Sequence, residues 1–179
     1  DYLDIEADRK HPEKRMRPLA SGAIPKQMAL VLFIICVLAG FGLALLVKQK
    51  FTFVLGIYFI MNLFYCFGLK NISILDVMIL AIGFVLRVKA GGIAAEIATS
   101  EWLIVMVFLL ALFMGIAKRR DDVLIRIESG QEMRKAAKGY NPDFLNVMLA
   151  LVSAVIIVAY LMYTMSPETE LRFHTYRLY

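Results

Sequence analysis

Cysteine is scarce in this sequence, and amphipathic periodicity is absent from it. The 179 residues contain two cysteines, Cys36 and Cys66, which lie inside apolar stretches with no spacing that suits a metal site or a disulfide framework. We expect both to be small, buried apolar side chains. Apolar residues do not recur with the period of an amphipathic helix or of a half-buried strand. These absences argue against a disulfide-stapled fold and a thiolate metal centre, and no segment has the pattern of a soluble domain.

Long apolar blocks are present instead. Sixty per cent of the residues are hydrophobic, whereas soluble domains are roughly half apolar. A helix that crosses a bilayer takes about 20 apolar residues, within a range of about 17–25. The sequence therefore predicts an all-α membrane protein, with residues 1–179 forming part of a single transmembrane domain. The five predicted spans are Met28–Val47, Phe51–Leu69, Ile72–Leu86 with its continuation to Ala95, Trp102–Ala117 and Phe144–Met165.

Charged residues lie mainly between these blocks and predict an orientation. The net charge of +5 would suggest a nucleic-acid partner for a soluble protein, but here membrane loops account for it, so we expect no nucleic acid. The first, third and fifth polar segments hold fourteen Lys and Arg residues, and the second and fourth hold two. Because cytoplasmic loops are enriched in Lys and Arg, we expect loops 1–26 and 118–141 to face the cytoplasm from the cell (inner) membrane. Four spans separate these loops, so both lie on one side and can form one site.

Three aspartates of the first loop share one face of a predicted helix. Asp1, Asp4 and Asp8 are spaced i, i+3, i+7. Their charges repel one another unless a cation lies among them, and Mg²⁺ commonly takes one or two carboxylates together with substrate phosphates. The sequence therefore predicts a magnesium site on these three residues. Glu6 points elsewhere on the helix and is not a predicted ligand.

Basic residues follow the aspartates directly. Pro12 should end the helix near His11, and Lys14, Arg15 and Arg17 come next. Carboxylates that hold a cation, beside Lys and Arg that bind phosphate oxygens, suit a metal-bound diphosphate. A mixed-charge surface loop without function is the alternative, since such loops are common beside membrane spans. The third aspartate, Asp8, lies on the same predicted helical face as Asp1 and Asp4, which favours a metal site over a loop without function.

The second loop carries both signs of charge. Lys118, Arg119 and Arg120 follow a span directly, and ordinary anchoring on the cytoplasmic side accounts for at least one of them. Asp121 and Asp122 do not contribute to orientation, and adjacent helical residues point about 100° apart. At most one of them is expected to face the first loop, and we favour Asp122 slightly as a further metal ligand.

Polar residues also occur within the spans. Arg87 lies about 22 Å along a helix that starts at Ile72, where a charge is costly and marks a cavity, a partner or a substrate path. Snorkelling of Arg87 to the far interface is an equal alternative. Asp76 lies one turn in from the cytoplasmic end. Tyr65 and Lys70 could place a phenol and an ammonium at the mouth of a cavity.

The segment before the last span has a structural interpretation. Asn141 is a typical N-cap residue, and Pro142 suits the first helical position. We therefore assign Gly139–Pro142 to the start of the last helix and give it no part in function.

Taken together, these residues resemble the UbiA prenyltransferase superfamily. Asp1, Asp4 and Asp8 match its first motif, N-D-x-x-D-x-x-x-D, and the Asn is expected just before Asp1. Within the superfamily, the continuation D-R-x-H-P-x-K-R-x-R-P is similar to that of the polyprenyl-phosphate phosphoribosyltransferases, and the likeness runs to about Lys138. Supporting matches are Tyr65–Lys70, Gly83–Arg87, Ala90–Gly92 and Lys118–Arg119.

The resemblance implies a bundle of about nine spans around a central cavity, with these five as the third to seventh. We accordingly expect further residues before Asp1 and after Tyr179. It also implies magnesium on the first motif, phosphoribosyl diphosphate as donor and the phosphate of a polyprenyl lipid as acceptor. The predicted catalytic residues are Asp1, Asp4, Asp8, Lys14 and Arg17, and the predicted phosphate-binding residues are Lys14, Arg15, Arg17, Tyr65, Lys70, Arg87, Lys118 and Arg119.

One departure from the superfamily bears on the choice of substrate. Users of prenyl diphosphates carry a second acidic motif, D-x-x-x-D, but the next carboxylate after Asp122 is Glu128. This difference favours the phosphoribosyl branch over transfer of a prenyl group to an aromatic acceptor, which remains the first alternative. A transporter is the second alternative, although ionisable residues at the midplane, typical of transporters, are limited to Arg87. A membrane scaffold would not explain the aspartates in phase.

Overall fold

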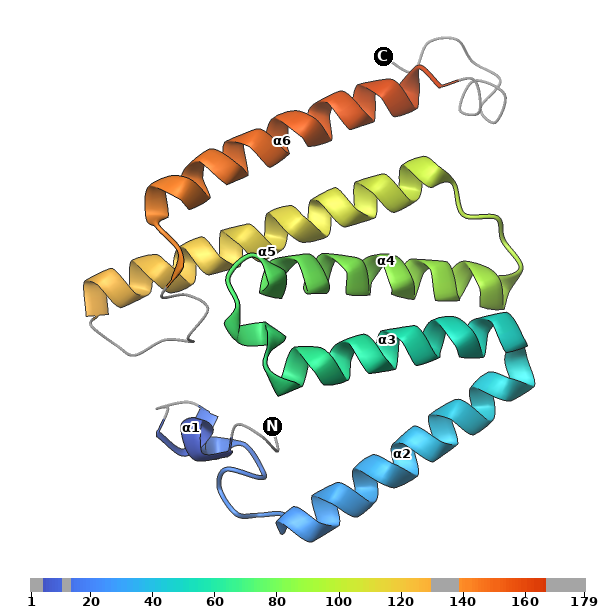
Figure 1. The fold of residues 1–179 in the computed structure, drawn as a ribbon, viewed down its shortest axis with the longest axis vertical. Helices are drawn as coiled ribbons and strands as arrows, with labels where there is room; N and C mark the ends of the chain where they lie inside the picture. The colour runs from blue at the N-terminus through green and yellow to red at the C-terminus, as the bar shows by residue number, and fades with distance from the viewer. Residues whose placement is uncertain (1–4, 11–13, 130–138, 167–179) are drawn as a thin grey trace. The chain divides into compact units, whose positions relative to one another are not determined.

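The computed structural model describes residues 5–10, 14–129 and 139–166, and every regular element within these ranges is a helix (Figure 1). Five of the helices are long and apolar enough to cross a membrane, and each coincides with one predicted span. The predicted all-α membrane fold is therefore confirmed. The elements are α1 (Ile5–Lys10), η2 (Lys14–Met16), α2 (Lys26–Val47), α3 (Gln49–Phe67), η3 (Leu69–Asn71), α4 (Leu75–Ala95), α5 (Glu101–Ser129) and α6 (Pro142–Thr164).

The chain divides into two compact units, Asp1–Thr52 and Phe53–Tyr179. In the first unit, the short helix α1 is tied to the turn that precedes α2. Arg9 Nε donates a hydrogen bond of 3.0 Å to the carbonyl oxygen of Ala20, and both Ile5 and Ala20 are buried. This hydrogen bond holds the turn before α2 against α1.

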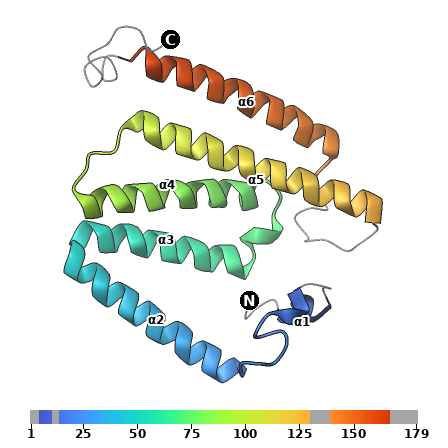
Figure 2. The ribbon, with the colours of Figure 1, turned by 180° about the vertical axis from the view of Figure 1, so that it is seen from behind.

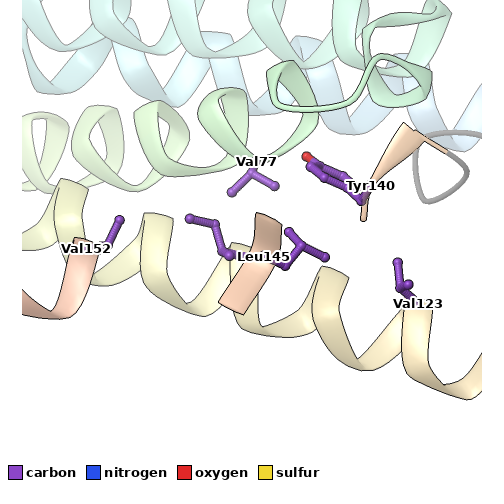
Figure 3. Packing of buried hydrophobic residues seen from close by; sticks show 6 residues of the cluster. Val77, Val123, Tyr140, Leu145 and Val152 are labelled. Atoms are coloured by element: carbon purple, nitrogen blue, oxygen red, sulfur yellow. The ribbon is translucent and has the colours of Figure 1, made fainter. Parts of the chain in front are cut away.

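The core of the second unit lies where α4, α5 and α6 run side by side (Figures 1 and 2). Helix α5 approaches α4 closely at Gly115, because a Cβ atom added there would lie 2.5 Å from Cγ1 of Val77. A bare glycine therefore sets the separation of these two helices. The buried side chains around this crossing, most of them labelled in Figure 3, are Val77, Ile116, Val123, Tyr140, Leu145 and Val152.

Much of the apolar surface is not covered by the described part of the chain. Helix α2 buries Ala44 alone and α3 buries no residue, and soluble monomers rarely expose apolar patches larger than a few hundred Å². The chain is an integral membrane protein whose outer helical faces meet lipid or other helices. Cys36 and Cys66 are free and exposed, so their predicted burial was wrong. An apolar sequence context indicates burial only in water, whereas a membrane helix turns its apolar side chains outward.

The structure also differs from the sequence interpretation at the end of α5. Residues from Lys118 onward were assigned to a loop, but the helix continues to Ser129. Ile116 and Val123 are seven residues apart on one face, and both are buried, so packing continues beyond the charged residues. A helix of 29 residues is about 44 Å long at 1.5 Å per residue, longer than the roughly 30 Å hydrocarbon core of a bilayer. We therefore expect the charged end of α5 to project from the membrane.

The predicted start of the last helix is confirmed. Asn141 accepts a hydrogen bond of 3.0 Å from the backbone N–H of Asp143, and Pro142 is the first residue of α6. The cap fixes where the chain enters α6 and thereby places the preceding residue, Tyr140.

Candidate functional site

The first polar cluster is built around Asp8. Asp8 lies on α1 and is 6% exposed. Arg17 Nη1 donates a hydrogen bond of 2.9 Å to Asp8 Oδ2. Helix α1 ends at Lys10, before Pro12, as the sequence predicts. Asp1 and Asp4 lie outside the described residues, as does the side chain of Lys14, whereas Arg15 is exposed.

Asp8 has the chemistry of a magnesium ligand. Carboxylate oxygens are the hard donors that Mg²⁺ takes in proteins, and the bond from Arg17 involves one oxygen of the pair. Within the described residues, no group of three His, Cys, Asp or Glu side chains is close enough to hold a metal ion. Two of the three predicted ligands fall outside that range, so the metal assignment remains a prediction.

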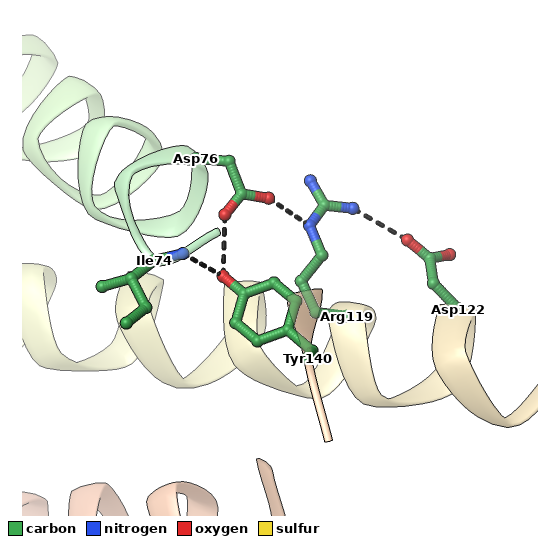
Figure 4. A network of polar contacts seen from close by, with 5 residues as sticks. All are labelled: Ile74, Asp76, Arg119, Asp122 and Tyr140. Atoms are coloured by element: carbon green, nitrogen blue, oxygen red, sulfur yellow. Dashed lines mark hydrogen bonds and ion pairs between the residues drawn. The ribbon is translucent and has the colours of Figure 1, made fainter. Parts of the chain in front are cut away.

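A second polar cluster joins three elements of the second unit (Figure 4). Asp76, at the start of α4, is fully buried and accepts from both Arg119 Nε and the hydroxyl of Tyr140, the latter at 2.8 Å. Arg119 Nη1 also donates to Asp122 Oδ2 at 2.8 Å. The Tyr140 hydroxyl in turn accepts a hydrogen bond of 2.6 Å from the backbone N–H of Ile74. We call Asp76, Arg119, Asp122 and Tyr140 the buried polar cluster.

The charges within the buried polar cluster depend on one another. Arg119 is 2% exposed, and a buried charge is tolerated only when it is paired and hydrogen-bonded. Removing one partner of such a pair typically costs about 3–5 kcal/mol, because the other charge is left uncompensated. Burial, together with the hydrogen bond to the Asp76 carboxylate and its charge, raises the pKa of Tyr140 to about 12. Tyr140 is therefore protonated at neutral pH and serves as a fixed donor.

A third polar contact links α3 to α4. Arg87 Nε donates to the hydroxyl of Tyr58 at 3.1 Å, and its guanidinium carbon lies 5.2 Å from the centre of the Tyr58 ring and 5.1 Å from that of Phe84. Stacking on two aromatic rings partly offsets the cost of a cation within a membrane span. The position of this contact along α4 separates it from the buried polar cluster, because eleven residues correspond to about 16 Å of helix.

An apolar cavity of about 370 Å³ lies between α4, α5 and α6. Its lining holds no charged residue, so it suits a hydrocarbon group rather than a sugar or a phosphate. Its lining includes Ile82 and Val85 from α4, Ile104 and Phe108 from α5, and Val155 and Ala159 from α6.

The profile of the UbiA prenyltransferase family matches residues 1–129. The chain belongs to this family. Among curated proteins, it is 34% identical over 162 residues to the decaprenyl-phosphate phosphoribosyltransferase of Corynebacterium glutamicum, covering 89% of this chain and 49% of that protein. It is 34% identical over 168 residues to the enzyme of the same name from Mycolicibacterium smegmatis, covering 94% and 53%. The chain thus spans about half the length of these relatives, and the family and their names indicate a transferase.

The fold of this UbiA-family chain has a close counterpart among solved structures. A UbiA homologue from Archaeoglobus fulgidus, bound to DMAPP and Mg²⁺, superposes with a TM-score of 0.78 at 20% sequence identity. The match covers 95% of this chain and 62% of that one. At this identity the likeness establishes the fold and leaves the substrate open.

The predicted phosphate-binding residues of this UbiA-family chain differ in their solvent exposure and in their partners. Lys118 is exposed, whereas Arg119 is enclosed by carboxylates. The side chain of Asp121 is 70% exposed and that of Asp122 is 22% exposed. Lys70 is half-buried on η3, beyond the end of α3.

Sequence reasoning missed the importance of Asp76, Tyr140 and Tyr58. Asp76 was visible as a carboxylate inside an apolar block, a costly position that calls for a partner. Tyr140 was assigned to the start of a helix without any function, and Tyr58 looked like one more aromatic residue of a span. Only the packing of separate helices reveals their partners.

Proposed function

We propose that the protein to which this chain belongs transfers 5-phosphoribose from phosphoribosyl diphosphate to the phosphate of a polyprenyl lipid. The relatives named decaprenyl-phosphate phosphoribosyltransferase support this assignment, because the likeness covers about nine-tenths of the chain. The observation that carries the choice of donor is in the sequence after Lys118. The second magnesium-binding motif of prenyl-diphosphate users, D-x-x-x-D, does not occur there, because the next carboxylate after Asp122 is Glu128.

The reaction is a displacement at the anomeric carbon of ribose. The bond from this carbon to the diphosphate breaks, and an oxygen of the acceptor phosphate forms the new bond. The acceptor is already an anion, so a strong general base is not required. Catalysis then rests on positioning the reactants and on neutralising the charge of the departing diphosphate.

Residues of the first loop provide the donor site in this proposal. Asp1, Asp4 and Asp8 would hold Mg²⁺, which neutralises charge on the diphosphate when bound. Lys14 and Arg15 would bind phosphate oxygens, and Arg17, already oriented by Asp8, would contribute a further cation. Arginine suits this place because its planar fork can bind a carboxylate and a phosphate at once.

We propose phosphate contacts for residues of the second unit as well. Lys118 would bind phosphate from the exposed side of α5, and Tyr65 and Lys70 from the end of α3. The apolar faces of the helices would accommodate the polyprenyl chain, whose head group would meet the donor at the cytoplasmic side of the cell membrane. Arg87 stays a predicted phosphate ligand, although its stacking on Tyr58 and Phe84 also suits an anchoring role.

The donor preference of the full-length protein tests the proposal. Purified protein in lipid, supplied with Mg²⁺, radiolabelled phosphoribosyl diphosphate and a polyprenyl phosphate, should form a lipid-soluble, acid-labile product. A parallel reaction with a prenyl diphosphate and an aromatic acceptor should give none. Prenyl transfer in the second reaction, with no product in the first, would overturn the assignment in favour of an aromatic prenyltransferase.

A further inference from the structure

The backbone next to the buried polar cluster is strained. Ile74, the residue before α4, has φ +73°, a conformation that is unusual for a β-branched residue. Such conformations cost on the order of 1–3 kcal/mol and persist where their surroundings hold them in place. Here the Tyr140 hydroxyl accepts a hydrogen bond of 2.6 Å from the Ile74 N–H. One phenol therefore fixes both this strained residue and the Asp76 carboxylate.

The chain before α6 is packed directly against the chain before α4. A Cβ atom added to Gly139 would lie 2.3 Å from Oγ and 3.3 Å from Cβ of Ser73. The contact leaves almost no room between the two segments. This close packing brings the Tyr140 hydroxyl within hydrogen-bonding distance of Asp76, at 2.8 Å. The bond connects the start of α4 to the segment that precedes α6.

Arg119 connects this junction to α5. Its Nε binds Asp76 on α4, and its Nη1 binds Asp122 one turn further along α5. A guanidinium held by two carboxylates in this way has a fixed direction, because its donors form a rigid fork. The neighbouring Lys118 is exposed, so the bonds of Arg119 help to fix the rotation of α5 on which the direction of Lys118 depends.

We propose that Arg119 is a positioning residue, which acts through Asp76 and Tyr140 to hold Lys118 at the substrate phosphates and does not itself touch them. This inference rests on the proposed function and refines it, because Arg119 was expected from the sequence to bind phosphate. Arg119 is 2% exposed, and its guanidinium binds two carboxylates, which would repel a phosphate anion.

Kinetic analysis of three conservative variants of the full-length protein tests this role. Arg119→Lys, Asp76→Asn and Tyr140→Phe should each lower kcat by about 10- to 100-fold, since a misplacement of about 1 Å can cost 100-fold. The KM for phosphoribosyl diphosphate should change by less than about threefold, because the first loop still binds the donor. Combining Arg119→Lys with Asp76→Asn should cost no more than the worse single change, as expected for residues that act as one unit.

Arg120→Lys is the matched control. Arg120 is the next residue on α5, and its Nε donates to Asn146 on α6 instead of to Asp76. Its kinetics should stay close to those of the unaltered protein. A large rise in KM for Arg119→Lys, with unchanged kinetics for Asp76→Asn, would instead show direct phosphate binding and overturn the proposal. Unchanged kinetics in all three folded variants, or loss of folding in all three, would reduce the cluster to a structural role and overturn it as well.

A measurement without substrate separates this inference from the proposed function. A nitroxide attached at Asp121→Cys, in a background with Cys36→Ala and Cys66→Ala, reports the mobility of α5 next to Lys118. Its spectrum should show faster motion in Tyr140→Phe and Asp76→Asn and no change in Arg120→Lys. If phosphoribosyl transfer is not found but these spectra change, the proposed function fails while the coupling of Arg119 to the junction stands. Identical spectra in every variant would overturn the coupling.

Discussion

Asp8 and its partner Arg17 show how single residues can serve two neighbours. The carboxylate is nearly buried, and its Oδ2 receives the guanidinium at 2.9 Å. An arginine in this position orients the carboxylate and also supplies positive charge beside the predicted metal. The pair therefore joins the acidic and basic halves of the first loop into one unit.

Substitution of the aspartates is the direct test at this scale. Asp1→Ala, Asp4→Ala and Asp8→Ala should each lower turnover by at least about 100-fold, because a bound metal contributes several kcal/mol of charge stabilisation. Glu6→Ala is the control, since Glu6 is exposed on the same helix and is not a predicted ligand. Turnover, membrane insertion and the Mg²⁺ dependence of the rate should be measured together. Near-normal turnover in Asp1→Ala or Asp4→Ala would refute the metal role.

Tyr140 gives a pH-dependent prediction. Its folded-state pKa is about 12 against an ordinary value of 10.0, so the folded state holds this proton more tightly than the unfolded state. The resulting stability is complete below pH 10 and is lost as the pH rises from about 10 to 12. Two pKa units correspond to at most about 3 kcal/mol. Thermal unfolding in detergent should show a steeper loss of stability above pH 10 in the unaltered protein than in Tyr140→Phe, and equal slopes would contradict the assignment.

The residue scale is also where prediction from the sequence reached its limit. A carboxylate inside an apolar block needs a partner, but the sequence does not show that the partner of Asp76 is Arg119, which lies 43 residues away. Helical periodicity shows which residues share a face and gives no information on which helices pack together. The aspartate spacing, in contrast, is a local property of one segment. Of the three aspartates only Asp8 lies in the described helix α1, so their shared face stays a prediction.

The five spans could be predicted from the lengths of the apolar blocks, because a bilayer requires about 20 apolar residues regardless of sequence detail. The length of the apolar block did not predict where α5 ends. The Lys, Arg and Asp residues after Ala117 predict a loop. Lys and Arg are nevertheless good helix formers, and buried Val123 continues the packing of Ile116. Hydropathy therefore gives the part of a helix inside the membrane and not the part that projects from it.

The crossing of α4 and α5 depends on Gly115. In Gly115→Ala, the added Cβ would meet Val77 Cγ1 at 2.5 Å, and valine has little rotamer freedom to move away. Overpacking of this kind costs about 1–3 kcal/mol, so thermal stability in detergent should fall. Gly91→Ala on α4 is the control, because nothing lies within 4 Å of its added Cβ and alanine favours a helix by up to about 1 kcal/mol. Equal stability of the two variants would contradict the close approach.

For the whole molecule, the fold and the family assignment agree, while the chain spans about half of its curated relatives. The exposed apolar faces of α2 and α3 are consistent with contacts to lipid or to further helices. Within the chain, the even number of spans between the two charged segments is a constraint on topology: both segments are expected to face the same side of the membrane.

That constraint predicts which positions are accessible from each side of the membrane. Single cysteines in place of Glu6 and Asp121, in a background without Cys36 and Cys66, should react with a membrane-impermeant thiol reagent only in inverted vesicles. A cysteine in place of Ala98, which is exposed between α4 and α5, should react only in right-side-out vesicles, because an odd number of spans separates it from either of the others. Labelling of Glu6→Cys and Asp121→Cys from opposite sides would separate the two clusters by a bilayer about 30 Å thick, and no phosphate could then bridge Asp8 and Lys118.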